Sequence, residues 1–325
     1  MNNSFQSVFA KHLTNYFIER KALGYKYDNH RRVLSQFDAF CWENGWEQLE
    51  ITEDLAKSFI YGESDLAHGT IHLREVALSY FAEYLYNFDV PVYNHTIRTK
   101  RPKGTGFTPH IFTDDELRRL FEVIDNQKPE KNSNKHLVDP VLFRLLLGSG
   151  LRISEALGLK VSDFHYEDSY IVLRHAKNDK ERVVPIAKSV AKRMHNLIGE
   201  LNFPDTPENR MVFMPPGRGY FRATTIERHF KDYLVLSGIP HTDKGPRVHD
   251  LRHTFCVKCF HRWASKGLDL ENLIPYLSTY LGHKDFRGTQ MYLHLTAEIY
   301  PDILVKAEAT LARLYRGGEF ADEKE

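Results

Sequence analysis

The chain has 325 residues, of which 42% are hydrophobic and 27% charged, a composition typical of a globular protein with enough length for two domains. No apolar run approaches the roughly 20 residues that a membrane-spanning helix needs, and the N-terminus lacks the features of a signal peptide. Three cysteines are an odd and small set, which argues against a disulfide scaffold and favours a reducing, cytoplasmic location.

The net charge of +1 does not by itself indicate a nucleic-acid partner. Residues 1–90 hold 8 Lys and Arg against 13 Asp and Glu, a net charge of −5, so the remainder carries 36 against 30, a net charge of +6. DNA binding would therefore require basic residues gathered on one face, and not a high overall charge.

Residues 1–92 predict a small all-α domain. Apolar side chains recur at helical spacing, for example Phe9, Leu13 and Tyr16, and glycines such as Gly24 and Gly45 separate the segments. We expect four or five short helices whose aromatic residues form a core.

Residues 93–112 predict a basic linker between two domains. Periodicity stops there, and Pro, Gly and Thr disfavour regular structure. The segment is either a solvated connector or a strap that contacts DNA phosphates. It contains no acidic residue and carries Arg98, Lys100, Arg101 and Lys103.

The second domain is expected over residues 113–300. It opens on a capping box at Thr113–Glu116, and helices are expected on either side of the Gly148–Gly150 break. Two β-rich runs, 170–174 and 182–186, flank a turn and predict a hairpin. The fold class is therefore mainly α with a small β-sheet.

Four short stretches in this domain contain polar residues whose side chains could take part in catalysis. The first has an arginine with Glu155 three residues on, close enough to hold its guanidinium, and the second has a lysine at the tip of the hairpin. The third has a histidine and an arginine on one helix face, and the fourth has a histidine and a tyrosine nine residues apart. Each stretch alone has an ordinary structural explanation. In chain order they supply Arg152, Lys177, His249, Arg252, His283 and Tyr292.

Together the four stretches resemble the tyrosine recombinase (phage integrase) family. Four sequence motifs are close to those of the family: GLRISEALGL, KERVVPI, HDLRHTF and LGH. The resemblance covers about residues 107–300. The N-terminal helices resemble, less specifically, the family's helical core-binding (SAM-like) domain. The hairpin departs from the usual Gly-Lys-Gly pattern, because Lys177 is followed by Asn178, and Lys180 is a possible stand-in that we expect at least to contact DNA.

The resemblance implies a two-domain DNA clamp that cuts and rejoins double-stranded DNA through a 3′-phosphotyrosine. Tyr292 would be the nucleophile, and Arg152 and Arg252 would hold the non-bridging phosphate oxygens. His249 would be a base or proton relay, His283 would hydrogen-bond the phosphate, and Lys177 would protonate the leaving 5′-oxygen. This chemistry requires no metal and no nucleotide cofactor.

Residues 301–325 predict a C-terminal helix followed by an acidic tail. The helix carries an apolar stripe that includes Leu304, Leu311 and Leu314, which must pack against another surface. It could dock on its own catalytic domain. The resemblance implies instead that it packs on a neighbouring protomer, in a homotetramer assembled on paired DNA sites. The sequence leaves open whether accessory proteins take part, and whether the system is a phage, transposon or chromosome-resolution element.

Other interpretations are weaker. His253, Cys256 and Cys259 have a spacing seen in metal sites, but they continue an apolar helix, which favours packing. No Gly-rich dinucleotide motif or P-loop is present. Two alternatives share the fold: a type IB topoisomerase-like enzyme, and a DNA-binding accessory protein without catalysis.

Overall fold

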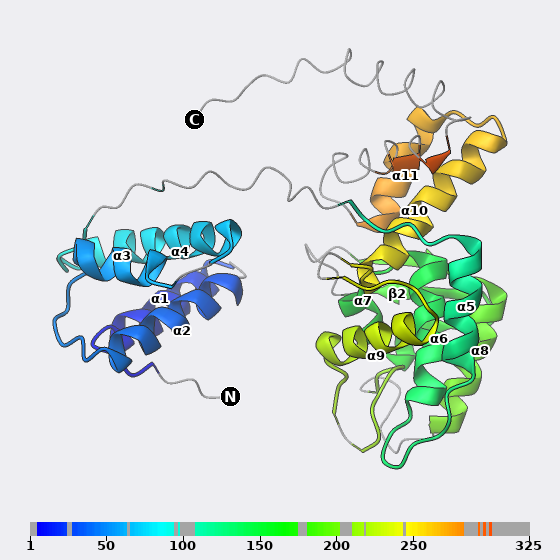
Figure 1. Cartoon of the computed structure of the whole chain (residues 1–325), viewed down its shortest axis with the longest axis horizontal. Coiled ribbons are helices and arrows are strands. Elements are labelled where there is room, and N and C mark those ends of the chain that lie inside the picture. Colours follow the sequence, from blue (N-terminus) through cyan, green and yellow to red (C-terminus); the bar gives the residue numbers. More distant parts are fainter. Residues whose placement is uncertain are drawn as a thin grey trace. The chain divides into compact units, whose positions relative to one another are not determined.

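A computed structural model describes residues 5–24, 28–63, 66–93, 97, 108–174, 181–201, 210–217, 219–242, 245–282, 292, 295–296 and 299–300. The chain divides into two compact units, Met1–Phe107 and Thr108–Glu325 (Figure 1). The mainly helical fold with one small sheet agrees with the sequence prediction. No helix in the described ranges is both long and apolar enough to cross a membrane.

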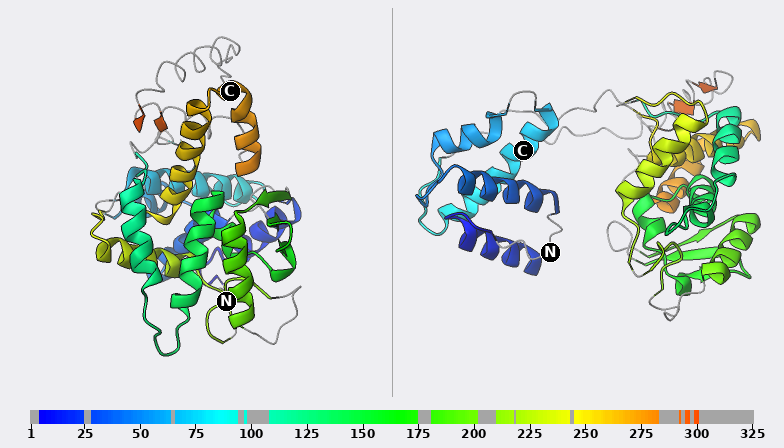
Figure 2. Two further views of the ribbon diagram at one scale, coloured as in Figure 1. Left: turned by 90° about the vertical axis from the view of Figure 1, so that its right-hand side faces the viewer. Right: turned by 60° about the horizontal axis from the view of Figure 1, so that its bottom comes forward.

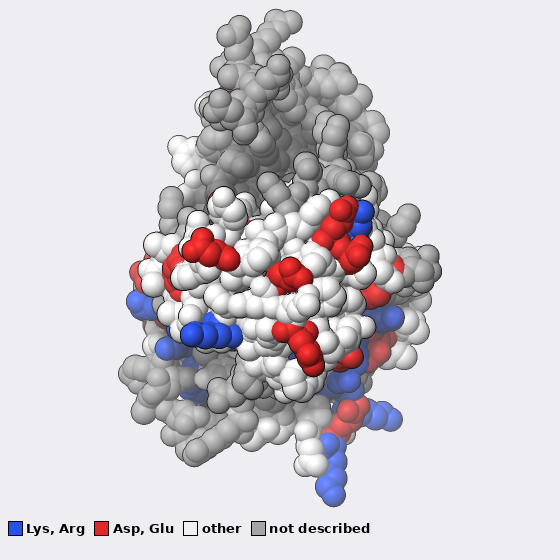
Figure 3. All heavy atoms as spheres, turned by 90° about the vertical axis from the view of Figure 1, so that its left-hand side faces the viewer, with Lys and Arg blue, Asp and Glu red and all other residues white. Residues whose placement is uncertain are grey.

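Unit 1 is a helical bundle with an aromatic core. Phe9, Tyr16, Phe37 and Phe81 are fully buried and their rings contact one another, which explains the aromatic spacing in the sequence. In the described part of this unit the helices are α1 (Ala10–Ala22), α2 (Asp28–Glu43), α3 (Glu53–Tyr61) and α4 (His68–Tyr86). The face drawn in Figure 3 is largely uncharged, with acidic side chains scattered over it and basic ones nearer its edges.

The first helix of unit 2 begins at the predicted capping box. The Thr113 hydroxyl accepts a hydrogen bond from the backbone N–H of Glu116, and the Glu116 carboxylate accepts one from the backbone N–H of Thr113. The helices that follow are α5 (Asp114–Asp125), α6 (Lys135–Ser149), α7 (Ile153–Leu157), α8 (Lys188–Leu201), α9 (Ala223–Leu236), α10 (Val248–Ser265) and α11 (Leu270–Leu281), with a 3-10 turn at Val161–Asp163.

The predicted hairpin is confirmed. Strands β2 (Tyr170–Leu173) and β3 (Arg182–Pro185) pair antiparallel, with Leu173 opposite Arg182 at the end nearest the turn. The sequence did not predict the two-residue strand β1 (Phe164–His165), which pairs with β2 and completes a sheet of order β1-β2-β3. The turn residues 175–180 lie outside the described residues.

Helix α6 is central to unit 2, because α5, α7, α8 and α10 all contact it. Its buried face includes Leu142, Leu145 and Leu146, which join the largest apolar cluster of the unit. Helices α10 and α11 lie side by side (Figure 2) and enclose a second cluster that contains Cys256, Leu277 and Tyr292. This arrangement brings the end of α6, the start of α7, the body of α10 and the end of α11 together.

Candidate functional site

Arg152 lies at a sharp turn between two helices. Helix α6 ends at Ser149, and Gly150 adopts a left-handed conformation with φ of 61°. A side chain at position 150 would also collide with the ring of Phe255 on α10, so glycine is required there for two independent reasons. Arg152 then occupies the N-cap position of α7 and projects from the end of that helix.

The expected contact between Arg152 and Glu155 is present. Arg152 Nη1 donates to Glu155 Oε1 at 2.9 Å, and the backbone N–H of Arg152 donates to Oε2 at 2.9 Å. The carboxylate therefore holds both the backbone and the guanidinium of the same residue. Such a two-point contact restricts the orientation of Arg152.

Arg252 is buried between the turn at Gly150 and the end of α11. Its side chain is on α10 and only 2% exposed. Nη1 donates to the carbonyl oxygen of Gly150 at 2.7 Å, and Nη2 donates to the carbonyl oxygen of Leu281 at 2.8 Å. The negative end of the α11 dipole also stabilises a cation there.

The two arginines converge on the end of α11. Arg152 Nη1 also donates to the Leu281 carbonyl oxygen, at 3.4 Å, and Nη2 donates to the carbonyl oxygen of Gly282 at 3.4 Å. Two fixed guanidiniums side by side form a centre suited to a phosphate with several anionic oxygens.

Tyr292 lies beside this pair of arginines. It is 2% exposed, its phenol lies beside the side chains of Arg252 and Cys256, and its ring packs 5.4 Å from that of His253. Burial raises the pKa of Tyr292 above its usual value, and nearby Cys256 adds to this effect while the charge of Arg252 opposes it. The phenol is therefore protonated at neutral pH in the DNA-free protein.

His249 lies one turn before Arg252 on α10 and faces a cavity. Although its side chain is exposed on the cavity side, loss of water around the ring and the positive charges of Arg252 and Arg152 lower its pKa to about 4. The imidazole is therefore neutral at pH 7 and can accept a proton.

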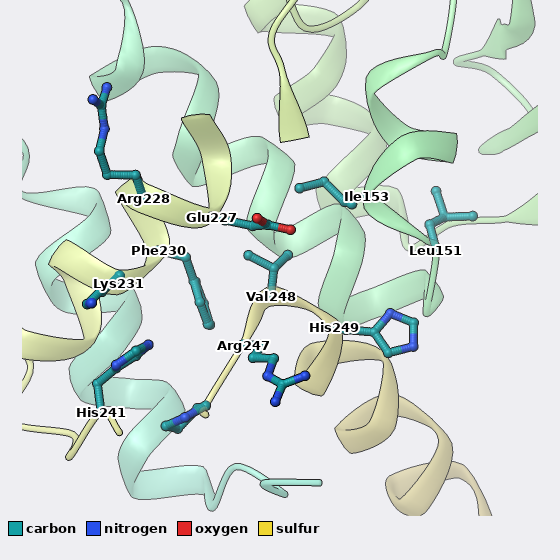
Figure 4. Close-up of a pocket in the computed structure, with 11 residues that line it drawn as sticks. Leu151, Ile153, Glu227, Arg228, Phe230, Lys231, His241, Arg247, Val248 and His249 are labelled. Carbon is teal, nitrogen blue, oxygen red and sulfur yellow. The ribbon is translucent and has the colours of Figure 1, made fainter. Parts of the chain in front are cut away.

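The cavity beside His249 has a volume of about 570 Å³ and an apolar floor with a polar rim (Figure 4). Leu151, Ile153, Phe230 and Val248 supply apolar lining, while Glu227 projects towards the middle. The rim carries basic side chains from α9 and from the segment before α10: Arg228, Lys231, His241 and Arg247.

Four of the predicted site residues are thus brought together: Arg152, His249, Arg252 and Tyr292. The others lie outside the described residues, as does the predicted C-terminal helix at 301–325. These others are Arg98, Lys100, Arg101, Lys103, Lys177, Lys180 and His283.

Two residues at the site were not assigned a place in it from the sequence. Cys256 contacts Tyr292, and Arg182 contacts Glu155. Arg182 could have been recognised, because the alternation of β3 places it on the same face as buried Val184. Cys256 is fully buried in the apolar cluster between α10 and α11, as the packing interpretation requires. Within the described ranges, no three His, Cys, Asp or Glu side chains are grouped as a metal site would need.

Comparison with known proteins identifies relatives of the chain. It is similar to the tyrosine recombinase XerA of Pyrococcus furiosus, with 28% identity over 210 residues that cover 65% of this chain and 66% of that protein. It is also similar to the tyrosine recombinase XerC of Actinobacillus succinogenes, with 24% identity over 314 residues, 95% of this chain and 99% of that protein. The Tn1549 transposon integrase, solved in complex with circular intermediate DNA, matches the fold with a TM-score of 0.61 and 18% identity, covering 86% of this chain and 94% of that one.

The family assignment follows from the match to a family model. The model for the phage integrase family matches residues 110–298, which contain every described residue of the arginine pair, the cavity and the tyrosine. The match covers more than half of the chain. The chain therefore belongs to the phage integrase family of tyrosine recombinases.

Proposed function

We propose that the chain is a site-specific recombinase that cleaves and rejoins DNA strands through a 3′-phosphotyrosine on Tyr292. One observation carries the proposal: the buried phenol of Tyr292 contacts Arg252, and Arg252 shares a backbone acceptor with Arg152. A nucleophile beside two fixed cations is the arrangement that attack on a phosphodiester requires. The integrase solved with circular intermediate DNA supports DNA as the substrate.

The two arginines would bind the non-bridging oxygens of the scissile phosphate. Their contacts with the Gly150 and Leu281 carbonyls fix the guanidiniums before the substrate arrives, so little reorganisation accompanies the reaction. Charge that develops on the phosphate in the transition state would meet cations that are already in position.

Neutral His249 would accept or relay the proton that Tyr292 loses, because its lowered pKa leaves an acceptor nitrogen at neutral pH. Lys177 would give a proton to the leaving 5′-oxygen, and His283 would hydrogen-bond the phosphate. The covalent intermediate would conserve the bond energy, so a second 5′-hydroxyl could reseal the strand.

We further propose that the rest of the chain serves recognition and assembly. Residues 1–92 would be a core-binding domain, residues 93–112 a basic linker on DNA phosphates, and 113–300 the catalytic domain. The helix in 301–325 would pack on a neighbouring protomer in a homotetramer on paired DNA sites. Lys180 would contact DNA beside Lys177.

The test is formation of a covalent protein–DNA adduct. Binding sites are first selected from a randomised duplex library, and a nick beside the cleavage position then traps the intermediate. We expect the wild-type chain to form an adduct, and Tyr292→Phe to bind the same DNA and form none, since only the nucleophilic oxygen is removed. An adduct with the variant would overturn the assignment of Tyr292. Binding without any adduct by the wild type would favour the accessory-protein alternative, and relaxation of DNA that lacks the site would favour the topoisomerase alternative.

A further inference from the structure

Arg182 is an unusual residue for its position in the fold. It opens strand β3, directly after the turn segment that contains Lys177, yet its side chain is only 12% exposed. An arginine at the base of a hairpin usually extends into water, because burial of a charge is costly unless the charge is paired. The partners of Arg182 therefore show what this burial achieves.

The first partner is the carboxylate that holds Arg152. Arg182 Nη2 donates to Glu155 Oε2 at 2.9 Å, the same oxygen that accepts the backbone N–H of Arg152. Burial acts to raise the pKa of Glu155, but the hydrogen bonds and charges of Arg182 and Arg152 outweigh it and hold the pKa below its usual value. Glu155 is thus an anion clamped between two arginines.

The second neighbour is Gly282, the residue before His283. Gly282 has φ of 67°, and a side chain there would lie 2.8 Å from Nη1 of Arg182. The guanidinium therefore packs directly against the backbone at the end of α11, where the carbonyls of Leu281 and Gly282 receive Arg152. Arg182 contacts both supports of Arg152: its carboxylate and the backbone that accepts its hydrogen bonds.

We propose that Arg182 is a positioning residue that couples the β2–β3 hairpin to the arginine pair by holding Glu155 and packing on Gly282. The proposal rests on the proposed function and deepens it. A change in the position of Arg182 would therefore reach Arg152 through Glu155 and through the backbone at Gly282. The alternative is that Arg182 pairs with Glu155 only to stabilise the fold.

Arg174 provides a matched control. It lies one residue beyond the end of β2, and its Nε donates to buried Asp163 at 2.6 Å. Arg182→Met and Arg174→Met each remove an arginine from the hairpin and leave a buried carboxylate without that partner. Only the carboxylate that pairs with Arg182, that of Glu155, also holds Arg152. A purely structural role predicts similar effects of the two substitutions, whereas a positioning role does not.

The experiment uses the full chain and the nicked substrate described above. We expect Arg182→Met to slow single-turnover adduct formation roughly 10- to 100-fold with DNA affinity unchanged, as misplacement of a reactive group does. Arg174→Met should leave the rate within about twofold of wild type. Because Arg182 acts through Glu155, the double variant with Glu155→Gln should be no slower than the slower single variant. Three outcomes would overturn the proposal. They are a double variant whose loss of rate is the sum of the two single losses, equal losses of rate in Arg182→Met and Arg174→Met, and an unchanged rate in Arg182→Met.

A second measurement does not depend on activity. In the DNA-free protein, the Nε–Hε NMR signal of Arg152, assigned by its loss in Arg152→Lys, should shift or broaden in Arg182→Met and stay in place in Arg174→Met. If Arg182→Met does not fold, Arg182→Lys keeps the charge but lacks the planar fork, and the same shift is expected. An Arg152 signal that does not move in Arg182→Met would refute the positioning role, whether or not the wild type forms an adduct. Failure of the wild type to form an adduct would count only against the proposed function.

Discussion

Arg152 and Arg252 donate to the same acceptor, the backbone carbonyl oxygen of Leu281, although they come from different helices. Two like charges this close repel each other, and the repulsion is offset by Glu155, by the Gly150 carbonyl and by the negative end of the α11 dipole. The repulsion between the two cations is therefore overcome when the protein folds, before any DNA binds. A phosphate that enters between them would relieve the remaining repulsion.

The first prediction concerns the shape of Arg252. We expect Arg252→Lys to reduce adduct formation on the order of 10²-fold, because a single ammonium cannot reach two carbonyls and a phosphate with fixed geometry. One buried carbonyl loses its donor, so the free energy of unfolding should fall by about 1–3 kcal/mol. Adduct assays and denaturant unfolding measure the two effects. The control is Arg118→Lys, which alters an exposed pair with Asp115 and should change neither quantity. Unchanged cleavage by Arg252→Lys would show that charge alone suffices.

The second prediction concerns the protonation of His249. Its pKa of about 4 lies below the unfolded value of about 6.5, so the unfolded chain binds this proton at a higher pH than the folded chain does. The contribution of His249 to stability is therefore complete above about pH 6.5 and is lost as the pH falls towards 4. In NMR titrations of the DNA-free protein, the His249 ring signal, assigned with His249→Asn, should not titrate near pH 6.5. A midpoint at the ordinary value would show that the ring is solvated and not held neutral.

The sequence predicted the local parts of this site well. The Arg152–Glu155 contact follows from a spacing of three residues at a helix start, and the strands of the hairpin follow from two β-rich runs on either side of a turn. The acceptors of Arg252 could not be predicted, because Gly150 and Leu281 are 102 and 29 residues away and contribute main-chain carbonyls that every residue has. The low pKa of His249 likewise depends on charges brought in by the fold.

The sequence predicts the orientation of Arg182 but not its partner. Alternation along β3 gives the face on which it lies, but the carboxylate of Glu155 that makes its burial tolerable comes from α7, 27 residues earlier. A periodicity argument assigns a face and does not assign a partner. The partners of buried Arg182 and Arg252 were therefore known only from the three-dimensional structure.

The third prediction concerns the basic rim of the cavity. Lys231 and Arg247 are exposed there. If both contact DNA phosphates, each neutral variant, Lys231→Gln or Arg247→Gln, should lower the slope of log affinity against log salt concentration by roughly 0.9. Binding isotherms across a salt series measure the slope. Arg118→Gln, on the exposed surface of α5 where it pairs with Asp115, is the control and should leave the slope unchanged. Slopes equal to that of the wild type in both rim variants would place the DNA elsewhere.

The last prediction separates the two lysines of the hairpin turn. The turn leaves the sheet at the Leu173–Arg182 pair, and Arg182 fixes that end next to Glu155. Lys177 takes the place of the catalytic lysine of the resembling family when the hairpin is aligned without a gap, which favours Lys177 over Lys180 as the proton donor. We expect Lys177→Ala to slow cleavage much more than Lys180→Ala does. A substrate with a sulfur at the 5′-bridging position has a leaving group that needs little protonation, so it should restore cleavage by Lys177→Ala. It should not restore cleavage by Arg252→Lys, whose defect lies in binding the non-bridging oxygens. If Lys180→Ala is instead the slow and rescued variant, the proton donor lies three residues later in the turn, and Lys177 contributes only to DNA binding.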